Sequence, residues 1–134
     1  MLCLCTKGSK MFRSTNPNPK KKMTGDCVVR AISIATNQSW MAVYSDLSVL
    51  GAKECDIMTS NSLWDDYLYE HNFTRYIIPN DCRCYTVRNF CRDHPEGTYI
   101  LATGTHVVAV IDGDYYDTWD SGEEIPIYYF KKEE

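Results

Sequence analysis

Three residues have the types that cysteine-based amide hydrolysis requires: Cys27, His106 and Asp117. Cys27 stands in the first turn of an expected apolar helix, where the positive helix end and its unpaired N–H groups stabilise a thiolate and lower the pKa of the thiol. A cysteine nucleophile also needs a base that accepts the thiol proton and a third group that orients the base. His106 falls in a strand-like run, and we expect it to be that base.

An Asp-Gly pair at 112–113 predicts a tight hairpin that brings His106 close to an acid. Asp-Gly is among the strongest sequence signals for a two-residue turn. With this pair at the turn centre, His106 and Asp117 become diagonal neighbours on one face, about 7–8 Å apart at their β-carbons, and Trp119 covers them. If the turn were one residue longer, Asp120 would replace Asp117 opposite the histidine. We prefer Asp117 as the orienting acid and keep Asp120 as the alternative.

The elements that position these residues run from helices to strands. Apolar residues at helical spacing predict helices at 27–36, at 40–50, from 61 or 62 onward, and at 87–93. Alternating β-branched and aromatic residues predict strands at 73–78, 98–102, 105–111, 115–119 and 125–130. Asp26 is the expected N-cap of the first helix, Asn37 its left-handed end, and Gly51 the end of the second helix. This order predicts an α+β fold in which the N-terminal helices, including the helix that carries the nucleophile, pack on a C-terminal antiparallel sheet.

The 134 residues fit a single domain, 1–134. Residues 1–23 are expected to form an irregular basic arm, because the segment Asn16-Pro17-Asn18-Pro19 disfavours a helix. No apolar run approaches the roughly 18 residues of a membrane span, and the start lacks the pattern of a signal peptide. We therefore expect a cytoplasmic protein with no membrane partner.

Basic residues gather at the N-terminal end. Residues 1–30 hold seven Lys and Arg against one acid, the rest holds seven against seventeen, and the net charge of the chain is −4. A basic arm on an acidic body is one pattern of nucleic-acid-binding proteins. However, no aromatic residue lies among Lys20, Lys21 and Lys22 to stack on bases. We expect these lysines to form a solvated segment before the first helix, not a nucleic-acid site.

The chain has seven cysteines, a high number for its length. Because no export signal is present, free thiols are expected instead of a disulfide framework. An alternative is a zinc site made of Cys82, Cys84, Cys91 and His94. Their spacing matches no common zinc module. We therefore expect no metal and no other cofactor, with zinc kept as an open alternative.

Two local motifs surround the candidate residues. They are Gly25-Asp26-Cys27, and the run from His106 to Val110 followed by Asp117-Thr118-Trp119-Asp120-Ser121-Gly122. This order of a helix cysteine, a strand histidine and an acid two residues before a tryptophan resembles the papain-like cysteine peptidase superfamily. The second motif is similar to the Asn-Ser-Trp or Asn-Pro-Trp segment of papain- and staphopain-like enzymes, and to the histidine and aspartate of bacteriocin-processing peptidases. The chain also resembles small proteins of bacteriophages and Firmicutes that carry the same pattern.

The resemblance implies a papain-like architecture and hydrolysis of an amide bond in a peptide or protein substrate, without a cofactor. Carried over by position, Cys27 is the nucleophile, His106 the general base and then the general acid, and Asp117 the group that holds the imidazole. Trp119 keeps the bond between the histidine and the acid dry.

The chain departs from the superfamily at the side-chain donor to the oxyanion. Papain-like enzymes have a glutamine about six residues before the cysteine, and here Lys21 holds that position. Asn18, Asn16 or Lys21 itself are the replacements to consider, together with the backbone N–H of Cys27. Losing one such donor typically costs about 10²–10³ in rate.

A second departure is Asp26, whose carboxylate opposes a neighbouring thiolate unless its charge is committed elsewhere. These departures leave a second hypothesis open. In it the chain is a papain-like binding or inhibitory module, encoded by a phage and directed at a host protein.

Overall fold

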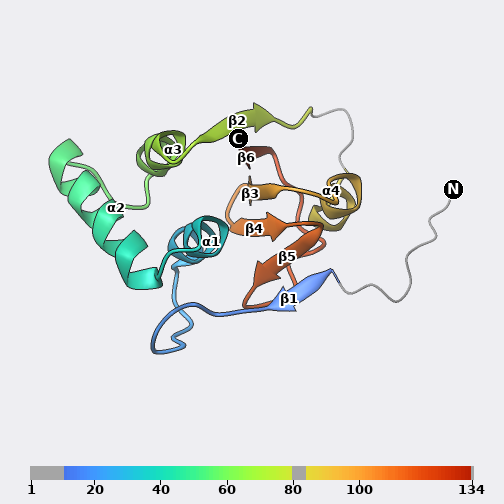
Figure 1. The fold of residues 1–134 in the computed structure, drawn as a ribbon, viewed down its shortest axis with the longest axis horizontal. Coiled ribbons are helices and arrows are strands. Elements are labelled where there is room, and N and C mark those ends of the chain that lie inside the picture. The colour runs from blue at the N-terminus through green and yellow to red at the C-terminus, as the bar shows by residue number, and fades with distance from the viewer. Residues whose placement is uncertain (1–10, 80–83, 134) are drawn as a thin grey trace, which may run out of the picture.

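The computed structural model describes residues 11–79 and 84–133. The helices are α1 (Cys27–Thr36), α2 (Trp40–Glu54), α3 (Asn61–Glu70) and α4 (Val87–Asp93). The strands are β1 (Phe12–Ser14), β2 (Phe73–Ile77), β3 (Thr98–Ala102), β4 (Val107–Ile111), β5 (Asp114–Asp117) and β6 (Tyr128–Lys132). Figure 1 shows α1 lying against the middle of the sheet and α2 on its outer side. The expected α+β class, with helices ahead of most strands, is confirmed.

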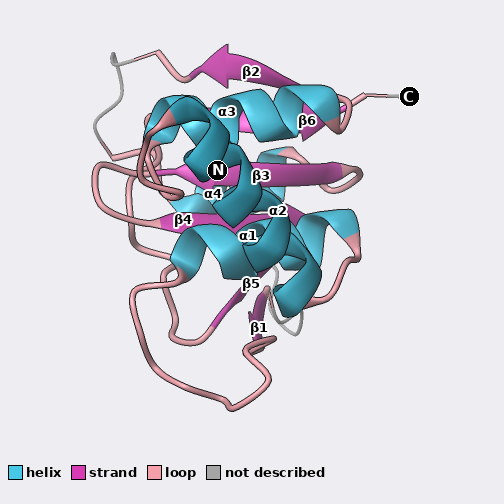
Figure 2. Ribbon diagram, turned by 90° about the vertical axis from the view of Figure 1, so that its left-hand side faces the viewer, coloured by secondary structure: helices cyan, strands magenta, loops and turns pink. Residues whose placement is uncertain are grey.

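The strands form one six-stranded sheet in the order β1-β5-β4-β3-β6-β2. Figure 2 looks onto the face that α1, α2 and α3 cover, with β2 at one edge and β1 at the other. Four strand pairs are antiparallel, and β1 pairs with β5 in parallel. The prediction of an irregular arm over residues 1–23 is therefore wrong at β1, and the sheet is mixed. A three-residue strand is too short to show a period, so only its pairing with β5 reveals it.

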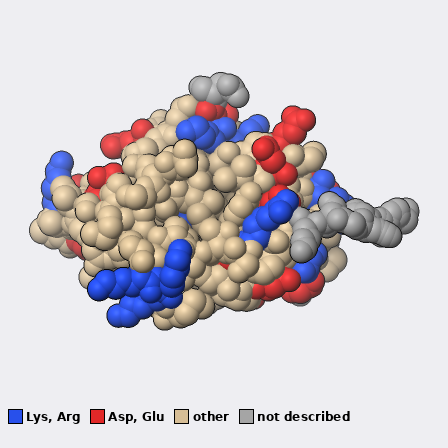
Figure 3. Space-filling view, turned by 60° about the horizontal axis from the view of Figure 1, so that its bottom comes forward, with Lys and Arg blue, Asp and Glu red and all other residues tan. Residues whose placement is uncertain are grey.

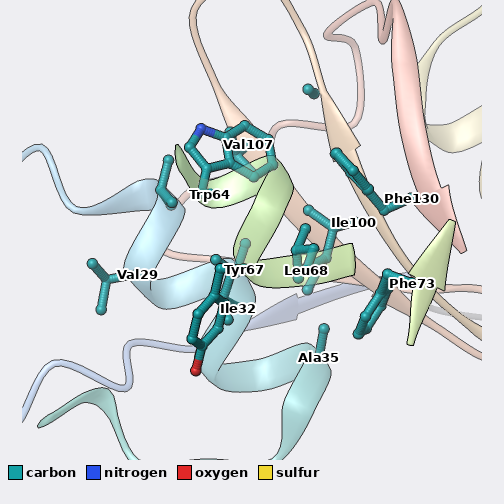
Figure 4. Packing of buried hydrophobic residues seen from close by; sticks show 14 of the residues in the cluster. Val29, Ile32, Ala35, Trp64, Tyr67, Leu68, Phe73, Ile100, Val107 and Phe130 are labelled. Carbon is teal, nitrogen blue, oxygen red and sulfur yellow. The ribbon is translucent and has the colours of Figure 1, made fainter. Parts of the chain in front are cut away.

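The sheet is buried on both faces. On one face, residues of α1, α2 and α3 pack against Ile100, Val107 and Phe130 (Figure 4). On the other face, α4 packs against Leu101 and Val108. Neighbouring residues of β3 and β4 thus point into opposite cores, and the apolar run over β4 is that of a strand covered on both sides. The central strand that follows His106 is consequently held between two packed layers.

The hairpin between β4 and β5 has the predicted turn. Asp112 and Gly113 have φ angles of 50° and 83°, the left-handed values that a two-residue type I′ turn requires. The predicted register is confirmed, with the residues on either side of the turn, Ile111 and Asp114, paired. Both strands are shorter than expected, so His106 lies just before β4 and Asp117 is the last residue of β5.

The helix ends agree with the sequence at α1 and differ at α2. Asn37 is the left-handed residue at the end of α1, as expected, and its backbone N–H donates to the Ile34 carbonyl oxygen. The prediction that Gly51 ends α2 is wrong, because the helix continues to Glu54 and ends at left-handed Cys55. A β-carbon at Gly51 would lie 3.0 Å from the carbonyl oxygen of Asp56, so this glycine permits close packing of the next loop. Among the helices of the described ranges, none has the length and apolar character needed to cross a membrane.

Candidate active site

Cys27, His106 and Asp117 come together, although they lie on three different elements. Cys27 is the first residue of α1, His106 precedes β4, and Asp117 ends β5. His106 Nε2 lies 2.6 Å from Asp117 Oδ2, and the imidazole adjoins the Cys27 thiol, so that each group shifts the pKa of the other. Because Nε2 is used by the carboxylate, Nδ1 is the ring nitrogen available to the sulfur. The imidazole therefore stands between an acid and a thiol.

A short turn fixes the position of His106. The side-chain hydroxyl of Thr103 accepts a hydrogen bond from the His106 backbone N–H at 2.9 Å, and the Thr103 N–H donates to the His106 carbonyl at 2.8 Å. Both bonds lie at the entrance to β4, whose next residues are buried. These two hydrogen bonds consequently hold the His106 backbone in the position from which its side chain extends into the site.

The thiol and the imidazole shift each other's pKa in opposite directions, that of the thiol downward and that of the imidazole upward. Burial alone would raise the pKa of Cys27, but the hydrogen bond and charge of His106, the Val107 backbone N–H and the charge of Arg30 together lower it below its ordinary value. Burial alone would lower the pKa of His106, but its bonds to Asp117 and Cys27 raise it to about 9. Both shifts favour the ionised pair, a thiolate beside an imidazolium, over the neutral pair.

Four donors hold the Asp117 carboxylate. Oδ2 accepts from His106 and from the Ser121 hydroxyl, the latter at 2.6 Å. Oδ1 accepts from the Thr118 backbone N–H at 2.8 Å and from the Arg30 guanidinium at 3.4 Å. Burial opposes the ionised form, but these donors lower the pKa of Asp117 below its ordinary value. The acid stays charged and cannot turn away from the histidine.

Arg30 connects this carboxylate to a second one at the start of α1. Its guanidinium binds both Asp117 and Asp26, and the side chains of Arg30 and Asp26 are each only 7% exposed. The other oxygen of Asp26 accepts from Trp40 Nε1 at 2.9 Å and from Asn18 Nδ2 at 3.2 Å. The charge of Asp26 is thus committed to Arg30, which removes the expected repulsion of the thiolate. Asp26 occupies the N-cap position, but its side chain caps no helix N–H.

Arg30 was not predicted as a site residue. Its signal was present, because an arginine in a helix that is apolar on nearly every side needs a buried acid as its partner. Cys27 and Arg30 are also three residues apart in α1, which places them on the same face of the helix. That face points toward the end of β5.

The proposed side-chain donors to an oxyanion lie elsewhere. Lys21 Nζ donates to the Asn16 carbonyl at 2.8 Å. The Asn18 amide is used by Asp26, and its oxygen accepts from the Lys20 backbone N–H at 2.9 Å. Asn16 in turn accepts from the Asn18 backbone N–H. In this conformation these residues tie their own loop together, so their donor groups are already engaged there, and a part for one of them at the oxyanion stays a prediction.

Two other donors face the thiol region. In the described part of the chain, the Cys27 backbone N–H makes no backbone hydrogen bond. Asn61, at the start of α3, lines a cavity together with Cys27. The Asn61 oxygen accepts from Trp64 Nε1 at 3.1 Å, which leaves its NH₂ group for another acceptor. Asn61 was not predicted as a site residue, because only the packing of α3 against α2 and β2 brings it to this cavity.

Trp119 and Asp120 differ in their relation to the histidine. The Trp119 ring lies 4.9 Å from the His106 ring, centroid to centroid, at an angle of 42°. It remains 43% exposed, so it covers one side of the imidazole and leaves the rest open. Asp120 instead accepts from the Tyr115 hydroxyl and from Arg88. The structure thus gives the histidine Asp117 as its acid and not the alternative, Asp120.

Two cavities meet at Cys27 and His106. One, of about 330 Å³, extends toward α3 and is lined by Asn61, Trp64 and Gly104 among others. The other, of about 270 Å³, extends toward Met23 and Trp119. The thiol and the imidazole line both cavities, so the two cavities adjoin at these side chains. This is the arrangement that attack on a substrate carbonyl requires.

No known family model matches the chain, and the searches of curated proteins and of solved structures found no match either. What the protein does must therefore be inferred from its own side chains.

The alternative zinc ligands have other surroundings. Cys82 lies outside the described residues. Cys91 is buried in the core under α4, where burial raises the pKa of its thiol to about 12. His94 Nδ1 lies 2.9 Å from the Phe90 carbonyl oxygen, and its ring stacks on that of Phe90. No group of three metal-binding side chains occurs within residues 11–79 and 84–133.

Proposed function

We propose that the protein is a papain-like thiol hydrolase that cleaves amide bonds in peptides or proteins. The observation that carries this proposal is the position of His106, which bonds to the Asp117 carboxylate and lines, together with Cys27, both of the cavities that meet at the thiol. The helix that begins with Cys27 packs on the sheet that carries the other two residues, in the arrangement that the superfamily resemblance implies. The fold and the site support the same function.

The proposed reaction has two halves. The Cys27 thiolate attacks the substrate carbonyl carbon, and the carbonyl π electrons move to the oxygen. When the C=O bond re-forms, the C–N bond breaks, and the His106 imidazolium gives its proton to the leaving amine. Neutral His106 then takes a proton from water as the water oxygen attacks the thioester. Collapse of that intermediate releases the carboxylic acid and restores the thiolate and the imidazolium.

The remaining residues stabilise or orient these groups. The Cys27 backbone N–H and the Asn61 NH₂ group are the proposed donors to the negative oxygen of the intermediate. Asp117 stabilises the imidazolium and fixes which ring nitrogen faces the sulfur. Trp119 covers one side of this pair, where it restricts the access of water.

The first test is the rate of alkylation of each thiol near pH 6. An ordinary cysteine is then almost entirely protonated, whereas a thiol paired with an imidazolium is largely ionised. We expect iodoacetamide to modify Cys27 at least about tenfold faster than Cys55, after allowing for the lower nucleophilicity of a thiolate with a lower pKa. Quantitative peptide mass spectrometry gives both rates in one sample. Cys55 is exposed and Cys27 is half-buried, so accessibility alone predicts the opposite order, and equal or slower labelling of Cys27 would refute an activated thiol.

The pH dependence of hydrolysis provides a second test. The reaction needs a thiolate and a protonated imidazole, so the rate rises as Cys27 ionises and falls as His106 loses its proton. Because the pKa of Cys27 is lowered and that of His106 is raised to about 9, we expect a bell-shaped profile of kcat/KM whose acid limb lies below the range in which an ordinary cysteine ionises. The alkaline limb should lie near pH 9. A rate that still increases through this range would contradict the proposed role of His106.

One observation favours a second function. The loop residues that were expected to supply a side-chain oxyanion donor bind to their own loop instead. A papain-like module that binds or inhibits a host protein has no need of such a donor. This function predicts rapid alkylation of Cys27 without turnover of any peptide, whereas the hydrolase predicts both.

A further inference from the structure

A third recess continues the groove beyond the nucleophile. It has a volume of about 370 Å³ and shares Gly25 and Thr59 with the cavity at Cys27. The loop before α1 forms one side of this recess, and α2 forms the other. A chain bound across Cys27 therefore reaches the recess by passing over Gly25.

The α2 side of the recess is aromatic and well supported. The rings of Trp40 and Tyr44 are stacked with their centroids 4.9 Å apart, and both residues line the recess with Met58. Trp40 is held in place by its bond to Asp26. Tyr44 is 42% exposed, so part of this apolar wall is open to a ligand.

The loop side of the recess is basic. Lys22 lines it, and Lys20 lies two residues earlier in the same exposed loop. Among the ion pairs of the described residues, none involves either lysine. The acid in the lining, Asp26, is buried and paired with Arg30. Figure 3 shows one cluster of Lys and Arg side chains at the lower left of this face, with no acidic side chain inside the cluster.

We propose that this recess, with Lys22 at its rim and Trp40 and Tyr44 at its wall, binds an acidic segment of the substrate. The preferred substrate then carries Asp or Glu a few residues from the bond that is cleaved. This inference rests on the proposed hydrolase function. Its physical basis is charge complementarity, since uncompensated ammonium groups beside an apolar wall favour a carboxylate whose neighbouring carbons cover the rings.

The test compares two quenched fluorescent peptides that differ only in Glu against Gln on one side of the scissile bond, with matched pairs for the other side. We expect the wild-type protein to cleave the Glu peptide with a kcat/KM about three- to tenfold higher at low salt, since a single exposed ion pair is worth about 1 kcal/mol or less. The preference should shrink at about 0.5 M salt, where the charges are screened.

Charge reversal locates the preference. Lys22→Glu should abolish or reverse the ratio between the two peptides, and the double variant Lys20→Glu with Lys22→Glu should do so more strongly. Lys53→Glu is the matched control, because Lys53 is also an exposed lysine but lies in the last turn of α2 and does not line the recess. If both peptides react equally in the wild-type protein, or if Lys53→Glu changes the ratio as much as Lys22→Glu does, the inference is wrong.

Binding separates this inference from the hydrolase proposal. The same peptides, labelled with a fluorophore, are titrated into the Cys27→Ala variant and followed by anisotropy. A Glu preference in this binding that depends on Lys22, together with a wild-type protein that cleaves neither peptide, supports the recess and refutes the hydrolase. Cleavage without a preference refutes the recess and supports the hydrolase. A single-stranded oligonucleotide that displaces the Glu peptide at equal or lower concentration would show that the lysines serve nucleic acid, and would also overturn the inference.

Discussion

Replacing His106 with alanine is expected to slow peptide hydrolysis by at least about 10³-fold, within the range found when a member of a catalytic triad is removed. The loss has two causes. Without the imidazole, the Cys27 thiol loses the hydrogen bond and the charge that lower its pKa, and burial then favours the neutral thiol. The leaving amine also loses its proton donor. Initial rates with a fluorogenic peptide measure the combined loss from both causes, and the rate of Cys27 alkylation near pH 6 measures the loss of the thiolate alone.

The control for this variant is His94→Ala. Like His106, His94 is a half-buried histidine. Its Nδ1 lies on the Phe90 carbonyl oxygen, and it stands at the C-terminal end of α4, on the other face of the sheet. Its removal should change neither the hydrolysis rate nor the alkylation of Cys27 by more than about twofold, the scale expected for a residue without a part in the chemistry. If His106→Ala keeps the wild-type rate while remaining folded, the proposed mechanism is incorrect.

Replacing Arg30 with methionine is expected to lower the free energy of unfolding at neutral pH by about 3–5 kcal/mol, the usual cost of removing one partner from a buried ion pair. The guanidinium is shared by Asp26 and Asp117, so its loss leaves the buried Asp26 carboxylate without a counter-charge and Asp117 with His106 alone. Chemical denaturation followed by tryptophan fluorescence measures the change. Arg13→Met is the matched control, because the Arg13–Asp114 pair is 51% and 23% exposed and such pairs contribute about 1 kcal/mol or less.

The effect of pH gives this prediction a second readout. In the wild-type protein, the pKa of Asp117 is below its ordinary value, so this acid stabilises the fold above about pH 4 and loses that contribution as the pH falls through its folded pKa. Without Arg30, the buried Asp117 carboxylate loses one of its donors, and lowering the pH relieves part of that cost. The difference in stability between the two proteins should therefore shrink from neutral pH toward about pH 4. A difference that stays constant or grows would show that Arg30 acts through packing and not through its charge.

Arg30 also links folding to chemistry. It lies on the same face of α1 as Cys27 and holds the acid that orients His106. The conservative variant Arg30→Lys keeps the charge but loses the two-sided fork of the guanidinium. If it folds with a displaced pH profile, the arginine positions the site as well as stabilising it.

The local sequence was sufficient to predict the elements whose signals are short-range. The helical spacing from Cys27 and the Asp-Gly turn at 112–113 depend on neighbouring residues, and both are present. The turn also determined that Asp117 and not Asp120 faces the histidine, because strand register follows from turn geometry. The candidate triad could therefore be named from the sequence.

Only the tertiary structure decided the features that depend on distant contacts. Strand β1 exists through its pairing with β5, and Arg30 reaches Asp117 across 87 positions of the chain. The expected donors Lys21 and Asn18 bind within their own loop, and Asn61 takes a place at the cavity through the packing of α3. Periodicity and turn chemistry report the conformation of a segment, whereas the partner of a buried charge or an edge strand is set by which segments pack together.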